Sequence, residues 1–262
     1  MAAEIAARPF QVWLNVVNAL LLRDIRVRAG WFYTGYMAVF LMPFAHLGVV
    51  LTFFVLTDRV PFIGTQPTLF FGLSILPFVI FVYPSRQIVV ALAANRPLLY
   101  FPRVKITDIV VARGLLESAN GMAVSAVVFI VLFIAVGEFS PRDPFGIVCA
   151  LLLTLYLGCA WGFANALISH LYPFWAIAFS LLFPLLWISS GIIINVHAFP
   201  SPYPQLFAYN PLLQCIEYMR YSYFEGYPDD ILDVWYVFWF ATCLIAMCLF
   251  FERTFRRVFL GA

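Results

Sequence analysis

The segment PTLFFGLSILPFVIFVYPSRQIVVALA, residues 67–93, decides the fold of this chain. It is long, almost wholly apolar, and its single charged side chain is Arg86. A helix needs about 20 consecutive apolar residues to cross the hydrocarbon core of a bilayer. The segment therefore predicts a transmembrane helix, and the rest of the chain is interpreted outward from it.

The composition of the whole chain points to the same environment. Of 262 residues, 64% are apolar and 11% are charged, and the mean hydropathy is +0.96. Soluble domains are about 45–50% apolar and about 25% charged. Such a chain cannot cover itself with polar surface in water, so its solvent must largely be lipid. The net charge of +2 is too small to indicate a nucleic-acid partner.

Five further segments reach a comparable length and apolarity. The six predicted spans are residues 31–57, 67–93, 109–137, 145–169, 172–194 and 231–251. We therefore predict an all-α integral membrane protein with six transmembrane helices, forming a single domain over residues 1–262.

The distribution of cations orients these spans, because cytoplasmic loops carry an excess of lysine and arginine. With both termini in the cytoplasm, the inner side holds most of the 15 cations, including Arg86 near the inner end of the second span. The outer segments then hold only Arg59, Arg142 and Arg220. We predict a multi-pass protein with both termini cytoplasmic.

The N-terminal stretch of about 8–28 is too polar for a span and predicts an amphipathic helix. One face carries apolar residues at helical spacing: Trp13, Val16, Val17, Leu20 and Leu21. Gln11, Asn15 and Asn18 fall on another face, and Arg23, Arg26 and Arg28 follow. The helix either lies in the inner interface with its basic residues facing anionic headgroups, or packs on protein as an ordinary first helix.

The outer segment 195–230 is too aromatic and apolar for a plain linker. We predict that it forms one or two short helices that dip back into the outer leaflet, as a re-entrant segment before the last span. Non-helical backbone at that depth is allowed only where protein or a wet cavity covers it. Glu217 and Arg220 are three residues apart and share a helical turn there, either shaping an outer gate or forming a surface ion pair of little consequence.

The sequence contains no motif for catalysis or nucleotide hydrolysis. Lys105 is its single lysine and stands outside any glycine-rich phosphate-binding turn. Neither a Gly-x-Ser-x-Gly elbow nor a His-Glu-x-x-His pair is present, and the three histidines are scattered. We expect no catalytic residue, no metal site and no cofactor in this chain.

Arg113 and Glu117 are four residues apart near the inner end of the third span, where ionisable groups are costly and usually pair. The pair is either a structural ion pair or a contact that transmits motion from the inner loop.

Four sequence features, in order, resemble a known family. They are LLRDIRVRAG (21–30), ANRPLLYFPRVKITD (94–108) leading to ARGLLE (112–117), YNPL (209–212), and EYMR (217–220) followed by a stretch rich in tyrosine and glycine. The chain resembles the permease subunit of capsular polysaccharide ABC exporters, in the type-2 ABC permease superfamily.

This resemblance implies a bacterial inner-membrane homodimer with two separate ABC ATPase subunits, which bind ATP and Mg. It also implies a lipid-linked capsular polysaccharide as cargo, with a periplasmic adaptor and an outer-membrane export protein as further partners. The loop between spans two and three would dock on the ATPase through Asn95, Arg96, Pro97, Leu98, Leu99 and Tyr100. Exposed apolar residues there would be a liability unless a partner buries them; the alternative is that they dip into the lipid interface.

In the family, spans one and five border the translocation path. That implies a set of aromatic side chains able to stack on sugar rings: Tyr33, Tyr36, Phe40, Phe44, Trp175, Phe179, Phe183 and Trp187. Packing against lipid or protein is the alternative for each of them. The predicted outer gate comprises Asn210, Glu217 and Arg220.

Two other functions compete with capsule export. One is a type-2 permease for O-antigen, teichoic acid or a smaller cargo. The other is a membrane glycan or acyl transferase, which would need clustered catalytic polar residues that the sequence does not show.

Overall fold

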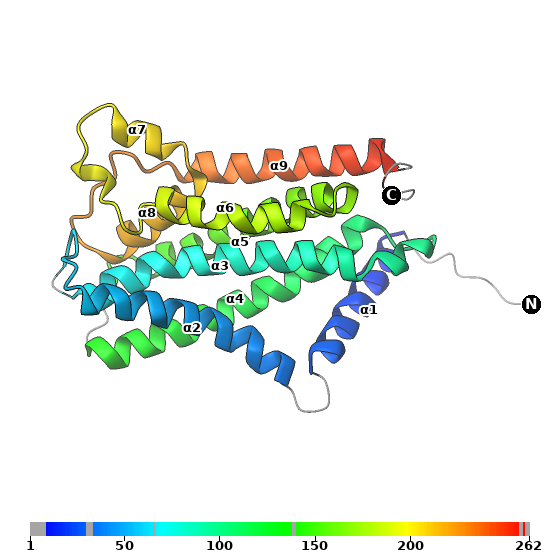
Figure 1. The fold of residues 1–262 in the computed structure, drawn as a ribbon, viewed down its shortest axis with the longest axis horizontal. Coiled ribbons are helices and arrows are strands. Elements are labelled where there is room, and N and C mark those ends of the chain that lie inside the picture. The colour runs from blue at the N-terminus through cyan, green and yellow to red at the C-terminus, as the bar shows by residue number, and fades with distance from the viewer. Residues whose placement is uncertain (1–8, 30–33, 65, 138–139, 257–258, 260–262) are drawn as a thin grey trace, which may run out of the picture.

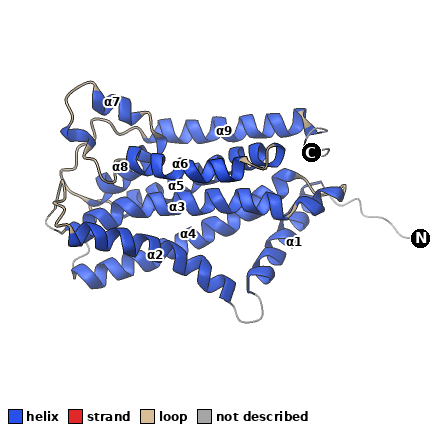
Figure 2. Ribbon diagram, in the orientation of Figure 1, coloured by secondary structure: helices blue, strands red, loops and turns tan. Residues whose placement is uncertain are grey.

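The computed structural model describes residues 9–29, 34–64, 66–137, 140–256 and 259, and in that part of the chain all regular structure is helical (Figure 2). The helices are α1 (Pro9–Ala29), α2 (Thr34–Leu56), α3 (Pro67–Ala94), α4 (Ile106–Val136), α5 (Pro144–Leu171), α6 (Trp175–Ser189), α7 (Tyr203–Ala208), α8 (Pro211–Tyr223) and α9 (Val234–Thr254), with short 3₁₀ helices η1 (Arg96–Tyr100) and η2 (Val196–Ala198).

Four of these helices, α3, α4, α5 and α9, are long and apolar enough to cross a membrane. Two more are apolar but shorter: the Leu41–Leu56 part of α2, and α6, whose 15 residues contrast with the 23 predicted for 172–194. The all-helical prediction is therefore confirmed for the described residues, and the four long apolar helices are consistent with an integral membrane protein. The number of spans remains a prediction.

The long helices run roughly side by side and alternate in direction (Figure 1). The end of α9, η1 and the first residues of α4 lie at one end of the bundle, and α1 slopes away from that end. The opposite end holds α7, α8 and the turn between α2 and α3. The predicted inner loop 94–108 thus lies at one end of the bundle, and the predicted outer segment 195–230 lies at the other end.

Helix α3 forms the centre of the bundle, packed on α5 and α4. It approaches α5 at Gly158 and Gly162, where a Cβ would lie 3.0 Å from the Phe81 carbonyl oxygen and 2.9 Å from the Ser85 Cα. Small residues four apart let two membrane helices approach this closely. The Ser85 hydroxyl also donates to the carbonyl oxygens of Phe81 (2.6 Å) and Gly158 (3.0 Å), which ties the two helices together.

Helix α1 uses its apolar face against the protein. Val17 and Leu20 are buried in the main core and the helix packs on α4, as the second interpretation of this segment proposed. Phe10 and Trp13, nearer the start of the helix, nevertheless stay exposed. The interpretation that Arg23, Arg26 and Arg28 all face lipid headgroups is wrong for Arg23 and Arg28, whose side chains bind protein groups.

The segment predicted to form short helices before the last span contains η2, α7 and α8. Helix α8 packs on α3, α5 and α9, and most of its residues are buried. Its start is fixed by Asn210, whose side chain accepts from the Leu212 amide at 3.0 Å and donates to the Ser189 carbonyl oxygen at 3.0 Å. The end of α6 and the start of α8 are thereby joined.

Candidate functional site

Three regions carry the predicted functional residues: the inner loop, a polar cluster beneath it, and a polar cluster at the opposite end. The inner loop contains η1, which follows α3 directly and ends at Tyr100. Its side chains divide into two groups. Tyr100 and Phe101 are 83% and 60% exposed, whereas Leu98 and Leu99 are half-buried against the core. The expectation that all four are exposed is therefore wrong for the two leucines, which help to hold η1 on the bundle.

Asn95 connects this loop to α1. It caps the C-terminus of α3, its side chain is buried, and it accepts a hydrogen bond from the Arg23 guanidinium. Arg96 and Pro97 are exposed beside it. The next helix begins in a fixed position too, because the Asp108 carboxylate accepts from the Lys105 amide at 2.9 Å. The predicted coupling loop is thus anchored at both ends and exposes two aromatic side chains between them.

The inner polar cluster, defined as Asp24, Arg28, Gln87, Arg113 and Glu117, joins α1, α3 and α4. Arg113 Nε lies 3.0 Å from Glu117 Oε1, so the predicted i,i+4 partners are in contact. Arg113 also contacts Asp24 at 3.2 Å and donates to Gln87 at 2.5 Å. Arg28 pairs with the same Glu117 oxygen and donates to Gln87 at 3.2 Å. The two-residue pair is therefore part of a five-residue network.

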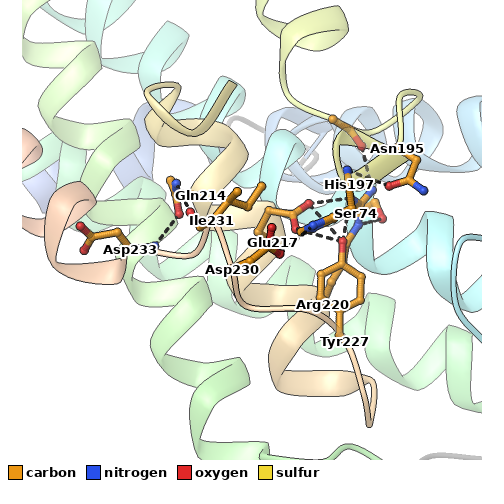
Figure 3. Close-up of polar contacts among 11 residues, drawn as sticks. Ser74, Asn195, His197, Gln214, Glu217, Arg220, Tyr227, Asp230, Ile231 and Asp233 are labelled. Atoms are coloured by element: carbon orange, nitrogen blue, oxygen red, sulfur yellow. Dashed lines mark hydrogen bonds and ion pairs between the residues drawn. The ribbon is translucent and has the colours of Figure 1, made fainter. Parts of the chain in front are cut away.

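The outer polar cluster, defined as Ser74, His197, Glu217, Arg220 and Tyr227, gathers side chains from α3, η2, α8 and the loop after α8 (Figure 3). Glu217 accepts from Arg220 (3.0 Å) and from Tyr227 (3.0 Å), and it lies 2.8 Å from His197 Nε2. Glu217 and Arg220 are 2% and 3% exposed. The alternative of a surface ion pair is therefore wrong.

Arg220 has further partners that account for its burial. Its Nε donates to Ser74 at 2.8 Å and its Nη2 donates to the Gly191 carbonyl oxygen at 3.0 Å. The guanidinium also lies over the Phe70 ring, 4.7 Å from its centre. A buried charge is tolerated only when it is paired and hydrogen-bonded, and Arg220 meets both conditions. It holds α8 to α3 and to the segment after α6.

The protonation states in this cluster are coupled. Burial lowers the pKa of His197, but the hydrogen bond and charge of Glu217, together with Asp230 at 3.0 Å, outweigh burial and raise it. Burial raises the pKa of Glu217, yet His197, Arg220 and Tyr227 together hold it below its ordinary value. Both groups are thus favoured in their charged forms, as a chain of Asp230, His197, Glu217 and Arg220 with alternating sign.

The aromatic residues predicted to line a translocation path have different environments. Tyr33 lies outside the described residues, as do the side chains of Tyr36 and Phe40, and Phe44 is half-buried on α2. Phe179 and Phe183 are 1% and 8% exposed within the bundle. These two pack on protein in this structure, which agrees with the alternative given for them, and their place on the path stays a prediction.

The remaining two aromatics of α6 are half-buried and have specific partners. Trp175 donates its indole N–H to the Asn165 side chain at 2.9 Å, and Trp187 stacks on Phe54 with ring centres 6.3 Å apart. The exposed face of α6 is instead aliphatic, formed by Ile177, Leu181, Leu185 and Ile188.

Several members of the two clusters were not predicted as site residues from the sequence. His197 was treated as one of three scattered histidines, and Ser74 and Tyr227 had no distinguishing spacing. Gln87, a polar residue near the end of an apolar span, and Asp24, the one acid among the arginines 23–28, could have been noticed. Within the described residues no group of three or more His, Cys, Asp or Glu side chains is arranged to hold a metal.

No protein-family model matches the sequence. Curated relatives match along most of the chain. The polysialic acid transport protein KpsM of Escherichia coli is 30% identical over 248 residues, which cover 93% of this chain and 95% of the relative. The capsule polysaccharide export inner-membrane protein BexB of Haemophilus influenzae is 30% identical over 220 residues, covering 80% and 79% of the two chains.

A third relative is the capsule polysaccharide export inner-membrane protein CtrC of Neisseria meningitidis serogroup B. It is 27% identical over 248 residues, covering 90% of this chain and 88% of the relative. The matches to KpsM and CtrC therefore extend over 93% and 90% of this chain, and the match to BexB over 80%. The chain belongs to the family of capsule polysaccharide export inner-membrane proteins, the permeases of type-2 ABC exporters.

Proposed function

We propose that this permease works as a homodimer with two separate ATPase subunits and moves a lipid-linked capsular polysaccharide across the bacterial inner membrane. ATP and Mg are bound by the partner ATPase, and a periplasmic adaptor and an outer-membrane protein continue the route. The chain itself forms one domain of six spans with both termini cytoplasmic. Its relatives' names support the capsule cargo, and the absence of a P-loop from the sequence supports a separate motor.

The observation that carries the ATPase contact is the exposure of Tyr100 and Phe101 on the anchored inner loop. Two large aromatic side chains on a loop with rigid ends suit burial in a partner's groove. Asn95 and Arg23 link the same loop to α1, and the inner polar cluster links α1 to α3 and α4. A displacement of η1 would therefore move α1, α3 and α4 together. This favours a role for Arg113 and Glu117 in transmitting motion from the inner loop.

The exposed apolar faces of α2 and α6 support a second copy of the chain. Met37 and Leu41 on α2, and Leu181 on α6, are each at least 66% exposed. The two helices meet where Phe54 of α2 stacks on Trp187 of α6. A path for a polymer is easier to build between two such surfaces than through the filled core of one bundle. At its outer end the path would meet Asn210, Glu217 and Arg220, which we propose as parts of the gate.

The ATPase contact is tested by the double variant Tyr100→Asp/Phe101→Asp. We expect the variant to insert and fold normally, because both side chains are exposed. It should no longer co-purify with the partner ATPase subunit, and capsule export should be abolished. Val60→Asp, at an 85% exposed site on the opposite end, is the matched control and should export normally. Full co-purification of the double variant with the ATPase would disprove this contact.

A further inference from the structure

A cavity of about 260 Å³ lies between α1, α2, α3 and α4, next to the inner polar cluster. Most of its wall is apolar, contributed by residues such as Met42, Val79, Ile80 and Val124. The remaining wall is polar and comes from Arg28, Gln87, Glu117 and Asn120. The cavity is therefore amphipathic, with one polar end.

Two hydrogen-bond donors at the polar end are left over. Arg28 Nη1 and Asn120 Nδ2 are buried, and neither makes a hydrogen bond of good geometry to any of the described residues, although the Asn120 amide interacts with the Glu117 carboxylate. Asn120 is 8% exposed and stands one turn after Glu117 on α4. A buried donor without an acceptor is costly, so two of them in one cavity wall indicate that something with acceptor oxygens belongs there.

Two guanidinium groups and two carboxylates meet near this end, so their charges balance. Arg28 and Arg113 both contact the same Glu117 oxygen, and Arg113 also contacts Asp24. Of these four residues, Arg28 and Glu117 line the cavity. Arg28 Nη1 has no hydrogen-bond acceptor among the described residues, and a guanidinium N–H forms its strongest hydrogen bonds with anionic oxygens, which favours an anionic oxygen group as the ligand.

The position of the cavity identifies the source of such a ligand. It lies between the C-terminal end of α1 and the first half of α2, and its apolar wall continues along α3 and α4. Basic pockets between membrane helices on the cytoplasmic side suit lipid headgroups. Its volume is below the roughly 300–1,000 Å³ of sites that enclose a whole small molecule. It can therefore take a headgroup and the first part of one acyl chain.

We propose that this cavity binds a phosphate-bearing lipid, with phosphate oxygens at Arg28 and Asn120 and an acyl chain along Val79 and Val124. Either a bilayer phospholipid or the lipid end of the cargo offers that chemistry. The inference requires only that the chain resides in a membrane, so its failure would leave the export proposal standing, and the reverse also holds.

The decisive variant is Asn120→Leu, in the full chain purified in detergent and stripped of lipid. The probes are phosphatidylglycerol, a diacylglycerol of the same chains without phosphate, and inorganic phosphate alone. We expect phosphatidylglycerol to raise the thermal midpoint saturably, and Asn120→Leu to weaken its binding about three- to tenfold, as loss of one hydrogen bond predicts. Without lipid, Asn120→Leu should change the midpoint little, because the Asn120 amide makes no hydrogen bond of good geometry that the leucine would lose.

Two more variants complete the test. Val124→Phe fills the apolar wall and should abolish the lipid effect, whereas Asn18→Leu makes the same change as Asn120→Leu at an exposed site on α1 and should leave it unchanged. The proposal is overturned if Asn120→Leu and Asn18→Leu bind phosphatidylglycerol equally. It is also overturned if diacylglycerol or inorganic phosphate produces the same shift at the same concentration.

Native mass spectrometry of the chain released from membranes separates the two sources. A retained mass equal to a phospholipid supports a bilayer lipid, and a heavier glycan-bearing mass, lost from cells that make no polysaccharide, supports the cargo. Release of wild-type and Asn120→Leu chains with identical lipid content, or with none, would contradict the site.

Discussion

Arg220 shows how much of the outer end depends on single residues. Its guanidinium contacts Glu217, Ser74 and the Gly191 carbonyl oxygen, so it joins α8, α3 and the segment after α6. Removing one partner of a buried ion pair leaves an uncompensated charge, whereas replacing both with apolar groups is often tolerated. The stability of this end should therefore respond differently to single and double changes.

We expect Arg220→Met to destabilise the protein by about 3–5 kcal/mol, because Glu217 would remain buried without its cation. The double variant Arg220→Met/Glu217→Leu should recover part of that loss. Arg142→Met, at an exposed arginine on the same end, is the matched control and should cost little. Chemical denaturation in detergent measures the free energy of unfolding of all three variants. A double variant that is less stable than Arg220→Met would contradict the role of the pair.

The pH dependence of stability should report on His197. Its pKa is raised from 6.5 because Glu217 and Asp230 outweigh burial, so its charged form stabilises the fold fully below pH 6.5. That contribution is lost as the pH rises through the raised pKa. We expect the thermal midpoint to fall as the pH rises above 6.5, and His197→Gln to flatten the slope. Equal slopes in wild type and His197→Gln would rule this out.

Contacts between residues of different segments were the features least predictable from the sequence. The i,i+3 and i,i+4 spacings placed Glu217 beside Arg220 and Arg113 beside Glu117, because neighbours on one helix depend only on helical geometry. Ser74, His197 and Tyr227 come from other segments, and their meeting depends on how helices pack. No local sequence pattern specifies that these side chains lie close together. Burial likewise depends on tertiary packing, so the surface alternative for Glu217 and Arg220 could not be dismissed beforehand.

At the scale of elements, the contact between α3 and α5 depends on Gly158 and Gly162. Their missing side chains allow backbone contact with Phe81 and Ser85. Without a hydrophobic driving force between helices in lipid, such close packing is a main source of stability. The segments themselves were predictable from length and apolarity, but which of them would lie at the centre was not.

A methyl group at Gly162 should force α3 and α5 apart, since its nearest neighbours are backbone atoms that cannot rotate away. We expect Gly162→Ala to cost about 1–3 kcal/mol, as overpacking does, and Gly162→Val to cost more. Gly48→Ala on α2 is the control, because a Cβ there meets no atom within 4 Å. The thermal midpoint in detergent is the readout, and equal midpoints for Gly162→Ala and Gly48→Ala would contradict the close contact.

Helix α6 shows where apolarity alone misleads. The sequence suggested a span over 172–194 lined by aromatics, yet the helix covers Trp175–Ser189 and turns Phe179 and Phe183 inward. An aromatic side chain suits the core, the lipid and a sugar equally, so composition does not determine which face it takes. Aliphatic residues occupy the exposed face instead.

For the whole molecule, the bias of arginine and lysine predicts which end faces the cytoplasm, and this can be measured directly. In a variant without native cysteines, a cysteine at Arg103, in the exposed inner loop, should react with a membrane-impermeant thiol reagent only after permeabilisation. A cysteine at Asp230, whose side chain is 60% exposed at the other end, should react in intact spheroplasts. The reverse labelling pattern would invert the topology and remove the proposed ATPase contact.

The shortness of α6 has a consequence for the membrane itself. Its 15 residues rise only about 22 Å, against roughly 30 Å of hydrocarbon in a typical bilayer. Its outward stripe of Ile177, Leu181, Leu185 and Ile188 is apolar, so lipid or a second copy must cover it. Lipid beside a short span thins to match it, at a cost of fractions of a kcal/mol per ångström. Each permease would then thin the bilayer locally. Polar headgroups there would lie closer to the midplane, and a sugar would cross a thinner hydrocarbon layer.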